Sequence, residues 1–301
     1  MTMNDSWEKV MFFGRNRAEK SQDLGKGKII SFLNQKGGVG KTTMCFNTAH
    51  ALAQKGHKVL VIDMDPQANM SYLFGHEDSR DSISIFNLLL NSVKELKHMH
   101  TSTIFEKVVF KTDVGVDLLP SGQELSGFEL CVAGISSPRQ MILKKYVEQA
   151  GIRKRYDYIL IDCPPTLGLL VVNSICVSDG VIVPFRPDDF SMKGLEHFYG
   201  MLSDIEDMEI VKLPEIITHI PNLMDTRRKQ EESDLDEIKE LIRKVTGDDR
   251  FIAPFFNKAQ IVKSQAAKKS IYAYNSKEYR PLHEQFNKIA NLIDSWNDST
   301  L

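Results

Sequence analysis

Paired cysteines are missing from this sequence of 301 residues. Its four cysteines stand apart, with no Cys-x-x-Cys spacing, at Cys45, Cys131, Cys163 and Cys176. This scatter argues against a zinc or iron-sulfur site and against a disulfide framework. It favours a reducing compartment.

Long apolar stretches and a strong charge of one sign are missing as well. No run approaches the roughly 20 apolar residues that span a bilayer. The first residues include Asp5 and Glu8 and only the short apolar run 10–13, so they do not form a secretory signal. The formal net charge is -2, so binding to DNA or an anionic membrane would need a local basic patch. We expect a cytoplasmic protein without stable membrane insertion.

Short, continuous apolar runs alternate along the chain with longer amphipathic segments. Such runs are typical of strands covered on both faces of a parallel sheet, and they lie at 29–33, 59–62, 116–119, 158–161, 181–183 and 216–220. Helices are predicted at 41–54, 139–148, 168–177, 192–205 and 234–245. The alternation predicts an α/β fold, a doubly wound and mostly parallel sheet flanked by helices.

The chain shows no internal repeat and no linker-like cluster of Gly and Pro. We therefore expect one domain over residues 28–301, preceded by an N-terminal extension over residues 1–27. In the extension Trp7, Val10 and Met11 form an apolar stripe at helical spacing. Such a stripe packs on its own domain, docks a partner or contacts a membrane weakly, and the sequence leaves these three alternatives open.

A glycine-rich segment follows the first predicted strand. Residues 34–43 read Asn-Gln-Lys-Gly-Gly-Val-Gly-Lys-Thr-Thr and lead into a predicted helix, which is the context that a phosphate-binding loop requires. The glycines let backbone N–H groups turn toward phosphate oxygens, and the helix presents its positive end to them. We expect Lys41 to reach the β and γ phosphates, Thr42 to supply a hydroxyl to Mg²⁺ and Thr43 to donate to the α phosphate.

The loop departs from the ordinary G-x-x-x-x-G-K-[ST] spacing. Gln35 stands where the first glycine belongs, and Lys36 follows it. Because Lys41 already serves the bound nucleotide, the extra lysine predicts a contact outside its own site. We expect Lys36 to reach the phosphates of a second subunit.

Three segments together resemble the deviant Walker A ATPases of the ParA/MinD family. Residues 36–43 resemble its deviant Walker A motif, residues 61–69 its second acidic motif and residues 158–165 its Walker B motif. The resemblance extends over residues 28 to 296. It implies a P-loop NTPase that uses ATP and Mg²⁺ and closes into a homodimer, with the first lysine crossing the interface. The loop residues that would bind ATP are Lys36, Gly37, Gly38, Val39, Gly40, Lys41, Thr42 and Thr43.

The acidic residues of these motifs would hold metal and water. Asp63 and Asp65 lie two apart at a strand end, so both side chains point to the same side at the carboxyl edge of the sheet. By the family pattern Asp65 positions or activates the attacking water, while Asp63 supports the metal shell. Asp162 would contact Mg²⁺ through water. The resemblance thus implies that Lys36, Lys41 and Asp65 are catalytic. It also implies that Thr42, Asp63 and Asp162 bind or support the metal ion.

Within this family the chain resembles the ParA and Soj branch. The stretches 65–67 (Asp-Pro-Gln) and 163–166 (Cys-Pro-Pro-Thr) resemble the corresponding stretches of the partition ATPases. Residues 294–301 are acidic, whereas MinD relatives end in a basic membrane helix. The resemblance implies a partition ATPase whose ATP-bound dimer binds DNA without sequence preference, associates with the nucleoid and hydrolyses ATP when a ParB-like partner stimulates it. Such a cycle segregates chromosome or plasmid DNA.

The residues that would contact DNA are carried over by region only. The family's Pro-Arg-Asn signature is replaced by Phe256, Asn257 and Lys258, and the basic residues nearby are Lys258, Lys263, Lys268 and Lys269. An ordinary solvated surface is the alternative for these lysines. Alternatives for the whole chain are a MinD-like ATPase on a membrane surface and a ParA-like ATPase that positions a non-DNA cargo. A reductase or metallochaperone is disfavoured because paired cysteines are missing.

Overall fold

The computed structural model describes residues 27–76, 83–96, 104–209, 211–225, 227–247 and 250–300, without the side chains of 189–192, 229, 245 and 298–300. The apolar stripe predicted at Trp7, Val10 and Met11 lies outside the described residues. No helix within these ranges is both long enough and apolar enough to cross a membrane.

A six-stranded sheet forms the centre of the fold, in the order β3-β2-β4-β1-β5-β6 with every neighbouring pair parallel. Its strands are β1 (Lys28–Phe32), β2 (Val59–Asp63), β3 (Val116–Leu119), β4 (Tyr158–Asp162), β5 (Gly180–Phe185) and β6 (Glu215–Pro221). The six predicted runs are confirmed as strands, with ends that differ by at most two residues. The doubly wound α/β prediction is correct.

Helices connect the strands and cover both faces. The elements that match predicted helices are α2 (Lys41–Gln54), α7 (Ile142–Gln149, after a short 3-10 turn), α8 (Leu169–Val177), α9 (Asp189–Asp207) and α10 (Lys229–Thr246). The helices not predicted are α3 (Asn69–Leu73), α4 (Ile85–Ser92), α5 (Phe105–Val108), α6 (Phe128–Cys131), α11 (Ala259–Ala266) and α12 (Arg280–Thr300). Most of these contain only one or two turns, too few for a periodic apolar pattern to stand out.

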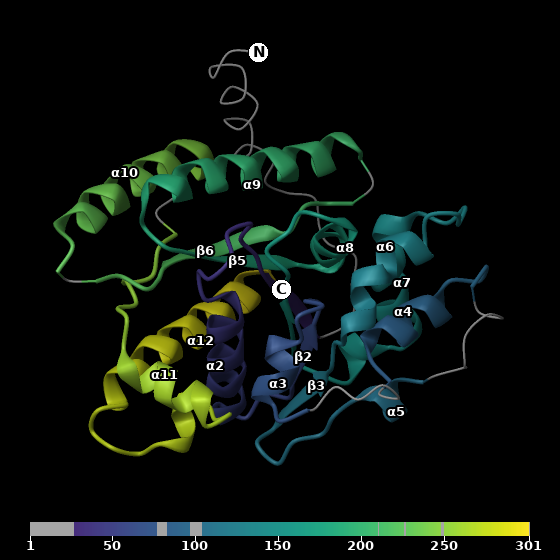
Figure 1. Cartoon of the computed structure of the whole chain (residues 1–301), viewed down its shortest axis with the longest axis horizontal. Coiled ribbons are helices and arrows are strands. Elements are labelled where there is room, and N and C mark those ends of the chain that lie inside the picture. The colour runs from purple at the N-terminus through teal and green to yellow at the C-terminus, as the bar shows by residue number, and fades with distance from the viewer. Residues whose placement is uncertain are drawn as a thin grey trace.

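Two apolar cores form because neighbouring residues of each strand point to opposite faces of the sheet. Ile30 of β1 packs with α2, α3 and α12 on one face. Ile29 packs with α4, α7, α8, α9 and α10 on the other. Figure 1 shows α2, α11 and α12 together at the lower left, α9 and α10 across the top, and α4, α6 and α7 at the right.

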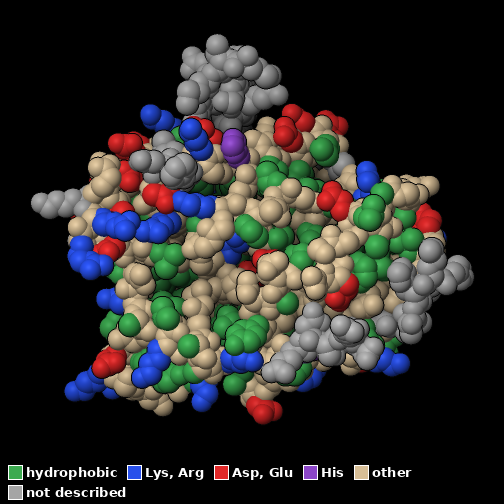
Figure 2. Space-filling view, viewed as in Figure 1, with side chains coloured by type: hydrophobic (Ala, Val, Ile, Leu, Met, Phe, Trp, Pro, Cys, Tyr) green, Lys and Arg blue, Asp and Glu red, His purple; other side chains and the backbone are tan. Residues whose placement is uncertain are grey.

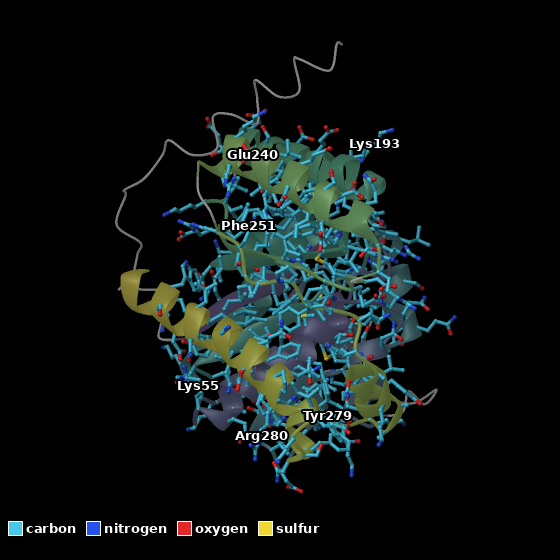
Figure 3. The ribbon with its side chains drawn as sticks, turned by 90° about the vertical axis from the view of Figure 1, so that its left-hand side faces the viewer. Lys55, Lys193, Glu240, Phe251, Tyr279 and Arg280 are labelled. Carbon is cyan, nitrogen blue, oxygen red and sulfur yellow. The ribbon has the colours of Figure 1, made fainter. Side chains whose placement is uncertain are left out.

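The last helix is fastened beside the end of α2. Lys55 forms an ion pair with Asp294 of α12 and donates a hydrogen bond to Asn291 at 2.6 Å. The Tyr158 hydroxyl donates to the same aspartate at 2.6 Å. Figure 3 shows Lys55 beside α12 and Arg280 at the beginning of that helix. These polar contacts flank the buried apolar face that α12 turns toward α2 and the sheet.

The carboxyl ends of the central strands bring three sequence motifs together. In the sheet Asp162 of β4 lies in register with Phe32 of β1 on one side and with Asp63 of β2 on the other. The glycine-rich loop follows β1 directly, and Asp65 follows β2. One edge of the sheet therefore carries the loop and all three aspartates.

Candidate nucleotide-binding site

The glycine-rich loop has the backbone conformation that its sequence predicts. Gly38 and Gly40 have φ angles of +74° and +91°, in the left-handed region that favours glycine. A Cβ atom at Gly40 would lie 2.3 Å from Nδ2 of Asn222, which donates to the Val39 carbonyl at 2.8 Å. A Cβ atom at Gly37 would meet nothing within 4 Å. The loop is thus supported closely at Gly40 and open at Gly37.

Asn34 anchors the beginning of the loop to the sheet. Its side-chain amide donates to the Pro184 carbonyl of β5 at 2.8 Å, and its oxygen accepts from the Lys36 backbone N–H at 2.8 Å. Asn222 at the end of β6 supports the other end of the loop. Contacts with β5 and with the end of β6 therefore hold the loop in this conformation.

Lys41 is held at the first turn of α2 with only 7% of its surface exposed. Its ammonium donates to the Lys36 carbonyl at 3.3 Å, so the side chain folds back over the loop. Burial lowers its pKa, while the nearby Asp162 carboxylate favours the charged form. A buried cation beside open backbone N–H groups is suited to phosphate.

Asp162 is the unusual member of the site. Its side chain is fully buried, and neither carboxylate oxygen has a hydrogen-bond partner of normal geometry in the described part of the chain. Burial and the neighbouring Asp63 raise its pKa well above the usual value, and the Thr42 hydroxyl and Lys41 act in the opposite direction. A buried carboxylate without partners is costly, which points to a ligand that completes it.

Magnesium fits this donor set. Mg²⁺ keeps several waters and binds through one or two carboxylates together with substrate phosphates. Asp162 supplies the unpartnered carboxylate, and the Thr42 hydroxyl lies at the same edge. Within the described ranges no three His, Cys, Asp or Glu side chains gather into an all-protein metal site. The arrangement suits an ion that arrives with a nucleotide.

The carboxylate of Asp63 is hydrogen-bonded to the segment that follows β2. Its Oδ1 accepts from the Asp65 backbone N–H at 3.1 Å, and its Oδ2 accepts from the Ser71 N–H at 2.9 Å and from the Ser71 hydroxyl at 2.7 Å. Burial raises its pKa to about 7, although these hydrogen bonds favour the ionised form. The Ser71 hydroxyl also accepts from the Ser121 N–H at 2.9 Å. Asp63 therefore shapes the segment that carries Asp65, and its predicted support of the metal shell would act through that segment.

Asp65 follows β2 at the same edge of the sheet. It is 8% exposed, and its Oδ1 accepts from the Gln67 N–H at 2.9 Å. Its Oδ2 accepts no hydrogen bond from the described residues. One oxygen thus orients the side chain, and the predicted role in positioning water would use the other.

Lys36 forms an ion pair with Asp188, which lies in the turn between β5 and α9. Both side chains are about 30% exposed. In the single chain the signature lysine is therefore bound to its own subunit, and the predicted contact with a second subunit would exchange this partner for another.

Three residues that contact the loop or the first turn of α2 were not predicted from the sequence: Asn222, Asp188 and Gln265. Asn222 follows the predicted strand 216–220, so its place at the carboxyl edge was a usable signal. Gln265 of α11 donates through Nε2 to Oγ1 of Thr43 at 2.6 Å, a contact between residues 222 positions apart. Nothing in the local pattern around Gln265 indicates this contact.

The four predicted DNA-binding lysines surround α11. Lys258 precedes the helix, Lys263 lies within it, and Lys269 follows it, all three exposed. Lys268 is partly buried, with its ammonium 4.0 Å from the ring centroid of Tyr72 and with a φ of 52°. Figure 2 shows basic side chains spread over α11 and α12 at the lower left. The four lysines thus lie within or directly beside one helix, α11.

The fold and the loop together define a P-loop nucleotide-binding protein of the α/β class. A family described as an AAA domain matches residues 27–214 of this chain. An uncharacterized protein of Methanocaldococcus jannaschii is 35% identical over 216 residues, which cover 71% of this chain and 80% of the relative. The chain therefore belongs to this family, the ParA/MinD-type P-loop NTPases, and its sequence stands with the ParA and Soj proteins.

Two named relatives are similar over a shorter span. The sporulation initiation inhibitor protein Soj of Bacillus subtilis is 35% identical over 169 residues, or 56% of this chain and 62% of Soj. The chromosome partitioning protein ParA of Caulobacter vibrioides is 35% identical over 56% of this chain and 59% of that protein. The similarity thus spans less than two thirds of the length of these two relatives.

Solved structures share the fold over most of the chain. The cobyrinic acid a,c-diamide synthase of Mycobacterium smegmatis, with a bound ATP analogue and magnesium, superposes with a TM-score of 0.71 at 25% identity. The similarity covers 90% of this chain and 95% of that one. A plasmid partition protein of Borrelia burgdorferi bound to AMPPNP superposes with a TM-score of 0.69 at 25% identity, over 88% and 98% of the two chains.

Proposed function

We propose that this chain is a ParA-like partition ATPase. It binds ATP with Mg²⁺, closes into a homodimer and, in that form, binds DNA without sequence preference. A ParB-like or other partner stimulates hydrolysis and release. This cycle takes place in the cytoplasm, on the nucleoid while ATP is bound, and it segregates chromosome or plasmid DNA.

The buried carboxylate of Asp162 carries the nucleotide part of the proposal. Two unpartnered oxygens beside Lys41 and Thr42 form a strongly polar, incomplete site directly behind a phosphate-binding loop. A magnesium ion would be held by the Thr42 hydroxyl, through water by Asp162, and by the nucleotide, and it would neutralise charge on the phosphates. The structures of the M. smegmatis synthase and the Borrelia partition protein hold nucleotides on the same fold.

In this proposal, different residues of the loop contact different phosphates of the nucleotide. Backbone N–H groups of residues 37–40 surround phosphate oxygens, Lys41 neutralises the β and γ phosphates, and Thr43 donates to the α phosphate. Asp65 positions the attacking water through the oxygen that Gln67 leaves unoccupied. Phosphoryl transfer asks little more of a protein than positioning and charge stabilisation.

The packing of α12 supports the partition cycle over the membrane-surface alternative. Leu282, Phe286 and Ile289 of this helix are buried against α2 and the sheet. An amphipathic helix binds a membrane through the same kind of apolar face. In α12 that face is already covered within the fold.

The proposal is tested by titrating the protein with ATP in the presence and absence of Mg²⁺. The wild type should bind more tightly with Mg²⁺ and hydrolyse ATP slowly. Lys41→Ala should abolish binding, whereas Lys94→Ala, on an exposed segment after α4, serves as a matched control. Asp162→Asn should bind ATP with little dependence on Mg²⁺. A wild type that does not bind ATP with Mg²⁺, or a Lys41→Ala variant with unchanged affinity, would overturn the proposal.

A further inference from the structure

The last turn of α11 and the segment that follows it are both hydrogen-bonded to the first turns of α2. Gln265 donates to the Thr43 hydroxyl oxygen at 2.6 Å. Six residues later the Ile271 N–H donates to Oδ1 of Asn47 at 3.0 Å, and the amide of this fully buried asparagine donates to the Thr43 carbonyl at 3.0 Å. Thr43 is therefore the point at which the phosphate loop meets the lysine segment 258–269.

The contact with Gln265 decides how the Thr43 hydroxyl can be used. A threonine hydroxyl has one proton to donate and two lone pairs that accept. Because the Gln265 amide occupies a lone pair, the proton remains for another acceptor. Thr43 lies in the first turn of α2, where the N–H groups of a helix attract an anion. Gln265 thus presents Thr43 as a donor to a phosphate.

The same segment also touches the element that follows Asp65. The Lys268 ammonium lies over the ring of Tyr72 in α3, and the preceding residue of α3, Ser71, holds the Asp63 carboxylate. The turn that carries Lys268 and Lys269 therefore rests on both the phosphate-loop helix and the helix behind the catalytic aspartate.

We propose that Gln265 is a positioning residue that orients the Thr43 hydroxyl for the α phosphate of the nucleotide and so couples nucleotide binding to the lysine segment 258–269. This inference rests on the proposed function. Loss of the Gln265 contact should weaken nucleotide binding, because Thr43 is no longer oriented. It should also reduce the gain in DNA affinity that the nucleotide brings and, because coupling between two ligands is reciprocal, the gain in nucleotide affinity that DNA brings by the same factor.

The first test measures ADP and Mg²⁺ binding by calorimetry. Gln265→Met keeps the length of the side chain and removes the donor, so the affinity should fall about fivefold, the typical effect of one hydrogen bond. Gln260→Met, the same change on the same helix, should leave it unchanged. In a Thr43→Val background the Gln265→Met change should have no further effect. A structural role alone would lower the affinity in both backgrounds and would overturn the proposal.

The second test measures binding of random-sequence duplex DNA with and without a non-hydrolysable ATP analogue. Gln265→Met should bind DNA like the wild type without nucleotide and gain less affinity when the analogue is added. Gln265→Asn, too short to keep the contact, should behave in the same way and replaces Gln265→Met if that variant folds poorly. If the wild type binds ADP and both variants match it, this inference fails and the proposed function stands. If the wild type binds no nucleotide, both fail.

Discussion

Lys36 and Asp188 form an ion pair within one chain although 152 residues separate them in the sequence. The pair ties the signature lysine of the phosphate loop to the turn that precedes α9. In the proposed dimer the same ammonium contacts phosphates of the other subunit. The proposed intersubunit contact would therefore compete with the intramolecular pair for one side chain.

Asp188→Asn should let the ATP-bound dimer form at lower protein concentration, because Lys36 no longer has to leave a carboxylate. Partly exposed ion pairs contribute about 0.2 to 1 kcal/mol each and a homodimer would break two of them, so the dimer affinity should rise by about twofold to thirtyfold. Sedimentation velocity with a non-hydrolysable ATP analogue measures this. Asp113→Asn, at an exposed position before β3, should have no effect. An unchanged concentration dependence in Asp188→Asn would show that the two contacts do not compete.

Asp65→Ala should retain ATP and lose hydrolysis by about two orders of magnitude, because the water-positioning oxygen is removed and the phosphate loop is not. A trapped ATP dimer should then accumulate on size-exclusion chromatography. Asp204→Ala, at an exposed position on α9, should hydrolyse ATP at the wild-type rate. Since Asp65 also accepts from Gln67, Asp65→Asn is the variant to compare if the alanine lowers thermal stability. Normal turnover in a folded variant would assign Asp65 another role.

Charge reversal of Lys268 and Lys269 to Glu should abolish DNA binding and preserve ATP-dependent dimerisation. With a net charge of -2, attraction to DNA must be local. Each phosphate contact contributes a slope of about -0.9 in log affinity against log salt, and a dimer doubles the number of contacts. Filter binding of random duplex across a salt series measures this slope. The exposed pair Lys94 and Lys107, reversed to Glu, gives the same charge change far from α11. Equal losses in both variants would indicate an effect of net charge alone.

His219 should make the fold sensitive to acid. The ring is fully buried, its Nε2 is 2.8 Å from the Tyr199 hydroxyl, and burial lowers its pKa to about 3. Between about pH 3 and the ordinary value of about 6.5, the unfolded chain binds a proton here that the folded chain does not. This contribution to stability is therefore lost as the pH falls below 6.5, by about 1.4 kcal/mol per pH unit.

Urea unfolding at a series of pH values between 4.5 and 7 checks this slope. His219→Gln should flatten it by about 1.4 kcal/mol per unit. His197→Gln, at an exposed position on α9, should leave the slope unchanged. Equal slopes in the wild type and in His219→Gln would mean that folding does not lower the pKa of His219.

The strands could be predicted because each is buried on both faces and therefore reads as a continuous apolar run. The phosphate loop could be predicted because Gly38 and Gly40 need left-handed backbone angles that other residues rarely adopt. The partners of these residues were not predictable. Asp188 and Asn222 reach the loop only through the order of strands β1, β5 and β6 in the sheet, which local patterns do not specify.

Asp63 shows the limit of a spacing argument. Two carboxylates two residues apart at a strand end indicate a shared side of the sheet, and Asp63 and Asp65 do lie at the same edge. Their hydrogen bonds differ because Ser71, in a five-residue helix that the sequence did not indicate, donates twice to Asp63, whereas Asp65 accepts from the Gln67 N–H. The environment of each carboxylate depends on tertiary contacts, which the spacing of the two residues does not specify.

The turn after α11 carries a backbone conformation that is unfavourable for its residue. Lys268 has a φ of 52°, where a side chain costs about 1 to 2 kcal/mol and a glycine costs little. The ammonium held in this way lies over Tyr72 on the neighbouring α3. The same conformation closes the end of α11, where the Lys268 and Lys269 N–H groups donate to the Gln265 and Ser264 carbonyls, each at 2.9 Å, so the backbone cost is offset by two hydrogen bonds that end the helix.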